Sequence, residues 1–284
     1  MSETTARTTS GNTPKTWFIT GTSRGFGRHW AEAALERGDR VTATARDLTT
    51  LEPLAERHGD RVLTLALDVT DKAAVDAAVS RAAEHFGALD VVVNNAGFMQ
   101  FGAVEEVGEE QARQQIETNF FGALWVTKAA VPLLRARGGG SIIQVSSVGG
   151  VLAFPTLGLY HASKWALEGL TQSLAAEVAG FGIRVTLVEP IAYGTGLLEN
   201  GVRATADPAY DPARAALYAG ADGLVTGDPR DTRDALLELA DSAAPPLRVF
   251  LGRGGLEILR EEYGRRLDGW EKWDDLSRRA QGGV

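Results

Sequence analysis

The stretch Lys15–Gly27, KTWFITGTSRGFG, joins a short apolar run to a turn rich in glycine. Its first part, Lys15–Thr20, predicts a buried strand, because a short apolar run that stops at turn residues is typical of strands covered on both faces. A helical pattern follows from about Gly25 to Arg37. The stretch is compatible with an ordinary tight turn between strand and helix. It also favours a phosphate-binding turn, because glycines let the backbone approach a pyrophosphate and a helix N-terminus offers free N–H groups.

Apolar runs and helix-like segments alternate along most of the remaining chain. Strands connected by helices of this kind imply βαβ units and a parallel sheet. Right-handed crossovers then give a Rossmann-type, doubly wound α/β sheet of about seven strands with helices on both faces. Strands are expected at about residues 15–20, 40–45, 61–67, 91–93, 141–147, 183–190 and 247–252, and helices at about residues 25–37, 72–86 and 108–135 and around residue 160.

The chain has 284 residues, of which 44% are hydrophobic, and this is enough for one large core. We therefore expect a single dinucleotide-binding and catalytic domain over residues 15–284. Residues 1–14 are rich in Ser and Thr and predict a disordered tail. Between about residues 193 and 228, Pro, Gly and Asp interrupt the periodicity, which predicts a variable loop segment over the substrate.

Composition excludes several classes of function. The chain contains no cysteine, so disulfides, thiolate metal sites and cysteine nucleophiles are excluded. A net charge of −8 argues against a nucleic-acid partner and against a basic membrane-binding face. No apolar run is long enough to span a bilayer or to form a signal peptide, and the histidines show no ligand spacing, so no metal site is predicted. We therefore expect a cytoplasmic protein that acts on a small molecule.

Tyr160 and Lys164 stand one helical turn apart in the stretch YHASKWALEG. Positions i and i+4 share a helix face, so the phenol and the ammonium lie on the same side. By itself the pair is typical of an exposed helix surface. It also fits a general acid or base, because a nearby cation favours phenolate in a group whose free pKa of about 10 is too high for a base near neutrality. Ser147, at the end of a predicted strand, would add a hydrogen bond to a developing alkoxide.

The end of the second predicted strand bears on the choice of cofactor. An acid at this point usually binds the ribose 2′-hydroxyl of NAD, whereas an arginine accommodates a 2′-phosphate. Here Ala45 ends the strand and Arg46 follows, while Arg24 lies within the glycine turn. Both guanidinium groups favour NADP(H) over NAD(H), because each would pair with the phosphate. Asp47 leaves NAD(H) open, because its side chain would serve the 2′-hydroxyl if it rotated inward.

With these motifs in view, the chain resembles the short-chain dehydrogenase/reductase superfamily over about residues 15–195. The resemblance rests on a set of motifs in a fixed order: a TGxxxGxG turn, an Asp-Val pair after the third strand, an NNAG turn, an asparagine, a serine and a YxxxK pair. It implies an oxidoreductase that moves a hydride between nicotinamide and a carbonyl or alcohol. The SVGG run and the YHASKWALEG stretch are similar to the branch that includes hydroxysteroid and retinol dehydrogenases.

Carried over residue by residue, the resemblance implies four catalytic residues. Tyr160 would be the acid or base, and Lys164 would bind the nicotinamide ribose and lower the tyrosine pKa. Ser147, selected over Ser146 by its spacing to the tyrosine, would hydrogen-bond the substrate oxygen, and Asn119 would hold a water in a proton relay. The cofactor-binding residues would be Gly21, Ser23, Arg24, Gly25, Phe26, Gly27, Arg46, Asp68, Val69, Asn95, Ala96, Gly97, Tyr160, Lys164, Pro190 and Thr195.

Two positions in this set carry alternatives. Asp68 and Val69 would contact the adenine, but the run DVTD also predicts the cap of a helix. The family commonly has Pro-Gly after the sixth strand, whereas Ile191 follows Pro190 here. The larger residue removes the conformational freedom of glycine, so the local backbone and the contact of Thr195 with the nicotinamide amide stay open.

Two further patterns concern surfaces. The acidic group Glu105, Glu106, Glu109 and Glu110 predicts a solvated helix start, which the helix dipole favours. Apolar residues at three- and four-residue steps near the C-terminus predict one helix face that packs into the core, against another subunit or over the substrate. They are Leu256, Leu259, Tyr263, Leu267, Trp270 and Trp273.

The predicted function is NADP(H)-dependent hydride transfer between nicotinamide and a hydrophobic ketone or secondary alcohol. The resemblance also implies a homodimer or homotetramer formed through the helices after residue 108 and around residue 160. Two alternatives stay open: a cofactor-retaining epimerase or dehydratase on the same fold, and a non-catalytic NADP(H)-sensing protein. The expected substrate pocket is apolar and consists of Phe98, Met99, Phe154, Leu157, Tyr193 and Leu197.

Overall fold

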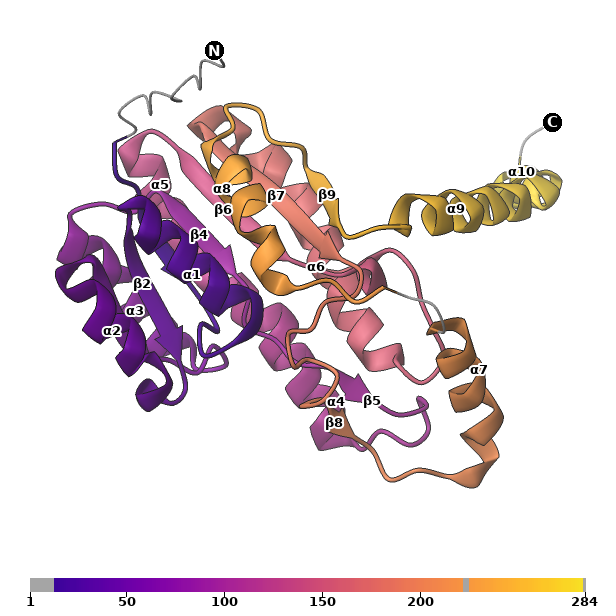
Figure 1. Ribbon diagram of the computed structural model, residues 1–284. Helices are drawn as coiled ribbons and strands as arrows, with labels where there is room; N and C mark the ends of the chain where they lie inside the picture. The colour runs from indigo at the N-terminus through magenta and orange to yellow at the C-terminus, as the bar shows by residue number, and fades with distance from the viewer. Residues whose placement is uncertain (1–12, 222–224, 283–284) are drawn as a thin grey trace, which may run out of the picture.

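The computed structural model describes residues 13–221 and 225–282, and a parallel sheet forms its centre (Figure 1). Seven strands lie in the order β3-β2-β1-β4-β6-β7-β9, and each neighbouring pair is parallel. The predicted Rossmann-type sheet is thereby confirmed, whereas residues 1–12 of the predicted tail lie outside the described residues. The strands are β1 (Thr16–Ile19), β2 (Arg40–Ala45), β3 (Val62–Ala66), β4 (Val91–Asn94), β6 (Gly140–Val145), β7 (Ile183–Pro190) and β9 (Arg248–Leu251).

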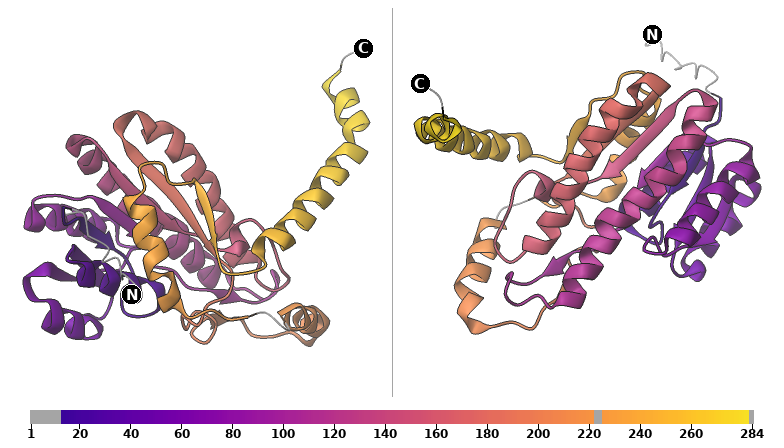
Figure 2. Two further views of the ribbon diagram at one scale, coloured as in Figure 1. Left: turned by 45° about the horizontal axis from the view of Figure 1, so that its top comes forward. Right: turned by 180° about the vertical axis from the view of Figure 1, so that it is seen from behind.

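Helices cover both faces of the sheet, as the views in Figure 2 show. Trp17 and Ile19 of β1 pack into a cluster with α1, α2 and α8, while Phe18 between them packs into a second cluster with α3, α5 and α6. Both faces of the strands therefore have to be apolar. The helices are α1 (Gly25–Arg37), α2 (Glu52–His58), α3 (Lys72–Phe86), α4 (Glu109–Ile116), α5 (Gly122–Arg137), α6 (Gly158–Val178), α7 (Asp211–Ala221), α8 (Arg233–Asp241), α9 (Gly255–Lys272) and α10 (Asp274–Gln281).

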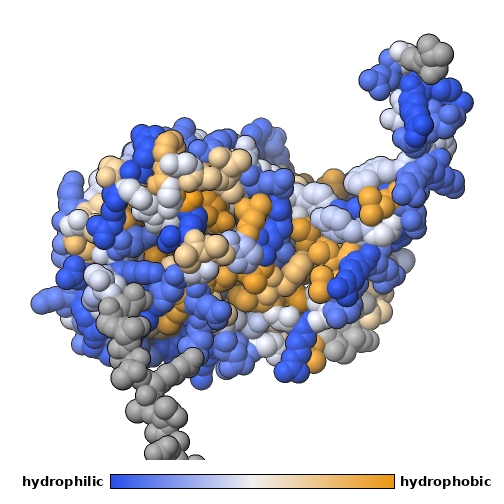
Figure 3. All heavy atoms as spheres, turned by 90° about the horizontal axis from the view of Figure 1, so that it is seen from above, coloured by the Kyte–Doolittle hydropathy of each residue, from blue (hydrophilic) through white to orange (hydrophobic). Residues whose placement is uncertain are grey.

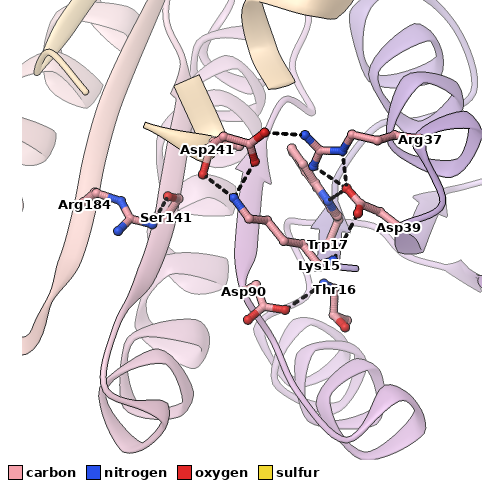
Figure 4. Close-up of polar contacts among 10 residues, drawn as sticks. Lys15, Thr16, Trp17, Arg37, Asp39, Asp90, Ser141, Arg184 and Asp241 are labelled. Atoms are coloured by element: carbon pink, nitrogen blue, oxygen red, sulfur yellow. Dashed lines mark hydrogen bonds and ion pairs between the residues drawn. The ribbon is translucent and has the colours of Figure 1, made fainter. Parts of the chain in front are cut away.

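Ion pairs fasten the amino ends of the central strands (Figure 4). The Lys15 ammonium before β1 donates to Asp241 at 2.5 Å and to the Ala240 carbonyl at 2.8 Å, both at the end of α8. Arg37, at the end of α1, reaches the same Asp241 at 2.7 Å. The indole of Trp17 donates to Asp39 at 2.8 Å. These contacts hold α1 and α8 to β1 at the amino ends of the strands. The opposite end of the sheet, at the carboxyl ends of the strands, is where an open sheet of this kind binds its ligands.

A second, two-stranded sheet joins segments far apart in the sequence. Strands β5 (Gln100–Phe101) and β8 (Val202–Arg203) pair in parallel, so the segment after β4 is tied to the variable segment after β7. The Arg203 guanidinium lies 4.5 Å from the centre of the Phe101 ring. No local periodicity in the sequence pointed to this pair, because each strand has only two residues.

The last two helices, α9 and α10, project away from the body (Figures 1 and 2). The predicted apolar stripe lies on them, but within this chain most of it is not core: Leu267, Trp270 and Trp273 are 53%, 69% and 63% exposed. Only Leu259 near the base packs into a buried cluster. The prediction of a core helix face is therefore wrong, and Figure 3 shows hydrophobic surface on the body near the base of this helix pair.

Candidate active site

The turn after β1 needs glycine at three positions. Gly21 and Gly25 have φ values of +70° and +58°, in the left-handed region that side chains disfavour. A Cβ atom on Gly27 would lie 2.5 Å from the Gly21 carbonyl oxygen, so no side chain fits there. The turn consequently brings bare backbone to the N-terminus of α1, in a cradle that a pyrophosphate would fit.

The NNAG segment after β4 holds this turn in place. The Asn95 side-chain amide donates to the carbonyls of Thr20 and Gly21, both at 2.9 Å. The Thr20 hydroxyl in turn accepts from the backbone N–H groups of Asn95 and Ala96, both at 3.0 Å. A Cβ atom on Gly21 would lie 2.9 Å from Ala96 Cα, so the two segments pack without side chains between them. Asn95 therefore shapes the cradle from behind.

The arginines and the acid near the end of β2 have separate environments. Arg24 and Arg46 are exposed, and no hydrogen bond or ion pair among the described residues uses either side chain. Asp47 instead accepts from the Thr49 backbone N–H at 3.0 Å and from the Thr49 hydroxyl at 2.8 Å, as the cap of a short helical turn. These hydrogen bonds from Thr49 hold the pKa of Asp47 below its usual value. The Asp47 carboxylate is thus already hydrogen-bonded to Thr49 in its present orientation.

Asp68 caps a turn just before α3 and not α3 itself. Its carboxylate accepts from the Thr70 backbone N–H at 3.0 Å and from the Thr70 hydroxyl at 2.8 Å, while the cap of α3 is Asp71. Asp68 remains exposed at the carboxyl end of the sheet. Val69 is buried, and a Cβ atom on Gly122 would lie 2.6 Å from it, so this turn is packed closely against α5.

Tyr160 lies in the first turn of α6 and is 3% exposed. Burial raises its pKa to about 12, and a hydrogen bond with Ser147 opposes this rise only in part. The sequence predicted a shift in the other direction. The difference arises because a buried phenolate is poorly solvated, and the neighbouring lysine does not offset that cost in this state. Ser147 is the serine that contacts Tyr160, whereas the hydroxyl of Ser146 is buried without a partner among the described residues.

Lys164 lies below Tyr160 on the same helix face. Its ammonium donates to the Val145 carbonyl at 2.8 Å and lies 5.9 Å from the centre of the Tyr160 ring. Burial lowers the pKa of Lys164 to about 8, and the Glu168 carboxylate one turn further along works in the opposite direction. The predicted pair on one helix face is therefore real, but it is buried and not part of an exposed surface.

Asn119 occupies a π-helical turn, Glu117–Phe121, between α4 and α5. Such turns often occur at functional sites because they displace one residue from the regular helix. The Asn119 side chain accepts from the Phe98 backbone N–H at 3.0 Å and donates to the Phe98 carbonyl at 2.9 Å and to the Ser163 hydroxyl at 3.1 Å. Asn119 thereby joins the segment after the NNAG turn to α6, the helix that carries Tyr160.

His161 is a buried, hydrogen-bonded residue next to Tyr160 that the sequence analysis did not include in the site. It is 5% exposed, and burial lowers its pKa, which favours the neutral imidazole. One ring nitrogen lies 2.8 Å from the Gly149 carbonyl, and the other accepts from the Phe154 backbone N–H at 2.9 Å. The ring therefore clamps the loop between Ser147 and α6. Its place directly after the tyrosine was the only signal in the sequence.

Family comparison agrees with this arrangement. The model of the short chain dehydrogenase family matches residues 15–205. The chain belongs to the short-chain dehydrogenase/reductase superfamily. Oxidoreductase BOA17 of Botryotinia fuckeliana is 38% identical over 270 residues, which cover 93% of this chain and 98% of that protein. A short-chain dehydrogenase from Streptomyces avermitilis is 38% identical with a TM-score of 0.86, over 94% of this chain and 98% of that one.

Other solved members of the superfamily were determined with nicotinamide cofactors. A 3-ketoacyl-(acyl-carrier-protein) reductase from Brucella melitensis, complexed with NADH, is 30% identical over 84% of this chain and 98% of its own, with a TM-score of 0.71. An alcohol dehydrogenase from Thermococcus sibiricus, complexed with 5-hydroxy-NADP, is 27% identical over 84% of this chain and 96% of its own, with a TM-score of 0.69. The family is therefore one of nicotinamide-dependent oxidoreductases, whose members differ in the cofactor that they hold.

In this short-chain dehydrogenase, the residue that departs from the family pattern packs away from the glycine turn. Ile191 joins a cluster with Phe250 and Leu259, and a Cβ atom on Gly255 would lie 2.5 Å from it. Thr195 lies beside the glycine turn, because a Cβ atom on Gly25 would be 3.0 Å from its own Cβ. The side chain in place of glycine is thus accommodated by small residues at the base of α9.

The predicted substrate pocket is only partly assembled as expected. Met99 and Leu157 form a buried cluster with Tyr160, and Leu197 packs against it. Two residues missed by the sequence analysis, Phe101 and Leu217, also pack there. They come from β5 and α7, so only the fold brings them to the site.

Two of the predicted pocket residues lie elsewhere. Tyr193 packs edge-on against Phe26 at 5.1 Å between ring centres and against the core cluster beside α1, and it is not part of the cluster at Tyr160. Gly227 permits this packing, because a Cβ atom there would lie 2.6 Å from the Tyr193 ring. Phe154 is 38% exposed and lies 5.6 Å from the His161 ring. Phe98 enters the site through its backbone contacts to Asn119.

The acidic group before α4 fastens the variable segment to the body. Glu106 was predicted to be solvated, but its side chain is 3% exposed and pairs with Arg214 of α7 at 2.7 Å. It also accepts from the backbone N–H groups of Asp207 and Ala103, at 2.6 and 2.7 Å. The Asp207 hydrogen bond, with the Arg214 and Ala103 contacts, lowers the pKa of Glu106 to about 2. These contacts of Glu106 hold α7 next to the apolar cluster at Tyr160.

Proposed function

We propose that this short-chain dehydrogenase is an NADP(H)-dependent reductase of a hydrophobic ketone, and in reverse a dehydrogenase of the corresponding secondary alcohol. One observation carries the proposal: the buried Tyr160, which is hydrogen-bonded to Ser147 and lies near Lys164, packs in an apolar cluster with Met99 and Leu157. A carbonyl on an apolar molecule would find its proton donor there. The relation to a named 3-ketoacyl reductase supports the same class of reaction.

The reduction needs a hydride on carbon and a proton on oxygen. A bound nicotinamide would supply the hydride, and the glycine turn and the NNAG segment would hold the dinucleotide. Tyr160 donates its proton to the carbonyl oxygen and is left as phenolate, which regains a proton from solvent. The Ser147 hydroxyl donates a hydrogen bond to the same oxygen as negative charge develops on it. The phenol carries its proton at neutral pH even with its ordinary pKa of about 10, and burial raises that pKa further, to about 12.

A panel of ketones and secondary alcohols, followed by NADPH and NADH absorbance, tests the proposal. We expect NADPH to be consumed with apolar ketones and consumed little with small polar ones. Formation of an isomer or a dehydrated product with no net change in NADPH would favour the epimerase or dehydratase alternative. Cofactor binding without turnover of any substrate would favour the sensing protein.

Replacement of Arg46 by aspartate is expected to lower kcat/KM for NADPH by about 10- to 100-fold, because a hydrogen bond between charged groups contributes about 1.5–3 kcal/mol. The efficiency with NADH should stay the same or rise, since the carboxylate would bond the ribose hydroxyls. Steady-state rates with both cofactors give the ratio. Arg40→Asp, at the exposed opposite end of β2, is the matched control and should leave the ratio unchanged. An unaltered ratio in Arg46→Asp would show that the cofactor assignment is wrong.

We also propose that the protein is a homo-oligomer in the cytoplasm and that a second copy covers the apolar stripe on α9 and α10. Acidic and basic side chains alternate along these helices and pair within them, as Arg266 does with Glu262 and Arg278 with Asp274. Because acidic and basic groups are present in similar numbers, this surface has no excess of positive charge that would attract nucleic acid or an anionic membrane. The same helices of a second copy would offer both signs of charge to pair with it. Among the described residues, no helix has the length and apolar character needed to cross a bilayer.

The double variant Trp270→Lys, Trp273→Lys is expected to shift the oligomer towards monomer, because two charges would enter the interface core. Sedimentation of both proteins at equal concentration measures the change. The control is Val104→Lys, Tyr218→Lys, which alters two side chains that are 72% and 63% exposed on other elements. An unchanged mass in the tail variant would rule out this contact.

A further inference from the structure

Two carboxyl groups are buried together behind Lys164. Glu168 follows Lys164 by one turn of α6 and is 5% exposed, and Glu189 on β7 is 1% exposed. Arg248 of β9 forms an ion pair with each of them: its Nε lies 2.9 Å from Glu168 Oε2 and 3.5 Å from Glu189 Oε1. A single guanidinium therefore faces two acids that have almost no access to water.

If both acids are ionised, the pair has more acceptor oxygens than hydrogen-bond donors to satisfy them. Glu168 Oε1 and Glu189 Oε1 are each buried without a donor among the described residues. Buried polar atoms in folded proteins are nearly always hydrogen-bonded, and two adjacent carboxylates repel each other. A proton held between the two groups supplies the missing donor and removes one negative charge. Consistent with this, burial and the neighbouring Glu168 raise the pKa of Glu189 to about 8.

Few other charged or polar groups face the pair. Lys164 approaches from α6 and Arg248 from β9, and Arg248 also donates to Gln172 at 3.0 Å. From the end of β6 comes Ser146. A Cβ atom on Gly150 would lie 2.5 Å from the Ser146 hydroxyl and 3.1 Å from Glu168 Oε1, so both polar atoms border the same small space. A polar path thus runs from the partly exposed Arg248 to the lysine behind Tyr160.

We propose that Glu168 and Glu189 form a proton-sharing carboxyl pair that keeps one negative charge beside Lys164, which makes Glu168 a positioning residue for the reaction. The role in the reaction rests on the proposed function, whereas the shared proton is a property of the protein alone. The charge matters because Lys164 is buried and its ammonium makes, among the described residues, a single hydrogen bond, to the Val145 carbonyl. With the proton on Glu189, the remaining charge lies on Glu168, the acid that acts on the lysine.

The two acids are expected to respond differently to neutral replacement. Glu168→Gln removes the charge next to Lys164, so the lysine loses its proton at lower pH. The alkaline limb of the ketone-reduction profile should then move down by about one pH unit or more, with kcat affected more than KM for the ketone. Glu189→Gln leaves Glu168 ionised, so the limb should stay in place. A lower kcat in Glu168→Gln with an unmoved pH profile would reduce Glu168 to a structural residue and overturn this role.

Infrared difference spectroscopy of the protein without substrate tests the shared proton itself. We expect wild-type protein near neutral pH to show a protonated carboxyl band that shifts in heavy water. Both Glu168→Gln and Glu189→Gln should lose the band, because a single acid then faces the guanidinium and ionises. Glu177→Gln, at an exposed position of the same helix, is the control and should keep it. No such band in the wild type, or a band that survives both variants, would overturn the proposal.

The two measurements separate this inference from the proposed function. If no ketone is reduced but the band behaves as expected, the carboxyl pair stands and the proposed reaction fails. If ketones are reduced but the band is absent, the reaction stands and the pair fails. Should Glu168→Gln not fold, the wild-type spectrum and the Glu189→Gln variant still decide the question.

Discussion

Replacing Tyr160 with phenylalanine is expected to lower kcat for ketone reduction by about 10²- to 10⁴-fold, the usual contribution of a positioned acid or base. The change removes only the hydroxyl. The ring is 3% exposed and packs with Met99 and Leu157, and phenylalanine fills the same space. The substrate oxygen would then lose its proton donor while the glycine turn and the NNAG segment, which hold the cofactor in this proposal, stay as they are.

Steady-state NADPH consumption measures the rate of this variant, and quenching of tryptophan fluorescence measures NADPH binding. We expect binding within about twofold of wild type and a similar thermal midpoint. Tyr218→Phe, at a position that is 63% exposed on α7, is the control and should keep full turnover. Wild-type turnover by Tyr160→Phe would remove the phenol from the chemistry. Intact biological activity with no turnover in either protein would instead point to a cofactor sensor.

Local features of the fold were predictable from the sequence because they depend on neighbouring residues. The predicted bounds of α1 and β2, Gly25–Arg37 and Arg40–Ala45, agree with the structure. A glycine turn, an apolar run and a 3.6-residue period all act over a few positions, so the chain displays them directly. The doubly wound parallel sheet of seven strands followed from the same alternation together with the handedness of crossovers, whereas the order of the strands was not predicted.

Features that depend on residues far apart in the chain were missed or mistaken. Glu106 looked like a solvated acid because its partners, Asp207 and Arg214, come about 100 positions later. Tyr193 is an aromatic residue of the kind that lines apolar pockets, but the absence of a side chain on Gly227 leaves room for its ring to pack against Phe26. The apolar stripe on α9 and α10 has helical periodicity, which specifies a face but not what covers it.

The pKa values of the site residues also depend on residues far apart in the chain. The spacing of Tyr160 and Lys164 showed that they share a helix face, but not how deeply the fold buries them. Burial favours the neutral form of each group, so it raises the pKa of the phenol to about 12 and lowers that of the ammonium to about 8. In the proposed reaction the lysine would act from a position where its own charge is costly, so its effect is best tested in the direction that needs phenolate.

Lys164→Met is expected to lower the rate of alcohol oxidation by about 10- to 1,000-fold and to move the rising limb of its pH profile upward. In the proposed reaction, oxidation requires the phenolate of Tyr160 as base. A cation nearby lowers a phenol pKa by about 1–3 units, and below the pKa each unit changes the phenolate fraction tenfold. Methionine removes the charge but fills similar apolar space, so the phenolate becomes rarer at each pH. An unmoved limb would show that the ammonium does not act on the phenol.

Stability separates this effect from simple damage to the fold. Burial lowers the folded-state pKa of Lys164 to about 8, below the ordinary lysine value of 10.5. The folded protein therefore binds this proton more weakly than the unfolded chain, and the charged lysine opposes folding as the pH falls below about 10, fully so below about 8. Lys164→Met removes this cost, so the thermal midpoint at neutral pH should hold or rise while oxidation slows. Lys128→Met, at an exposed position on α5, is the control and should change neither. A lowered midpoint together with lowered activity would mean that the lysine mainly supports the structure, through its hydrogen bond to the Val145 carbonyl.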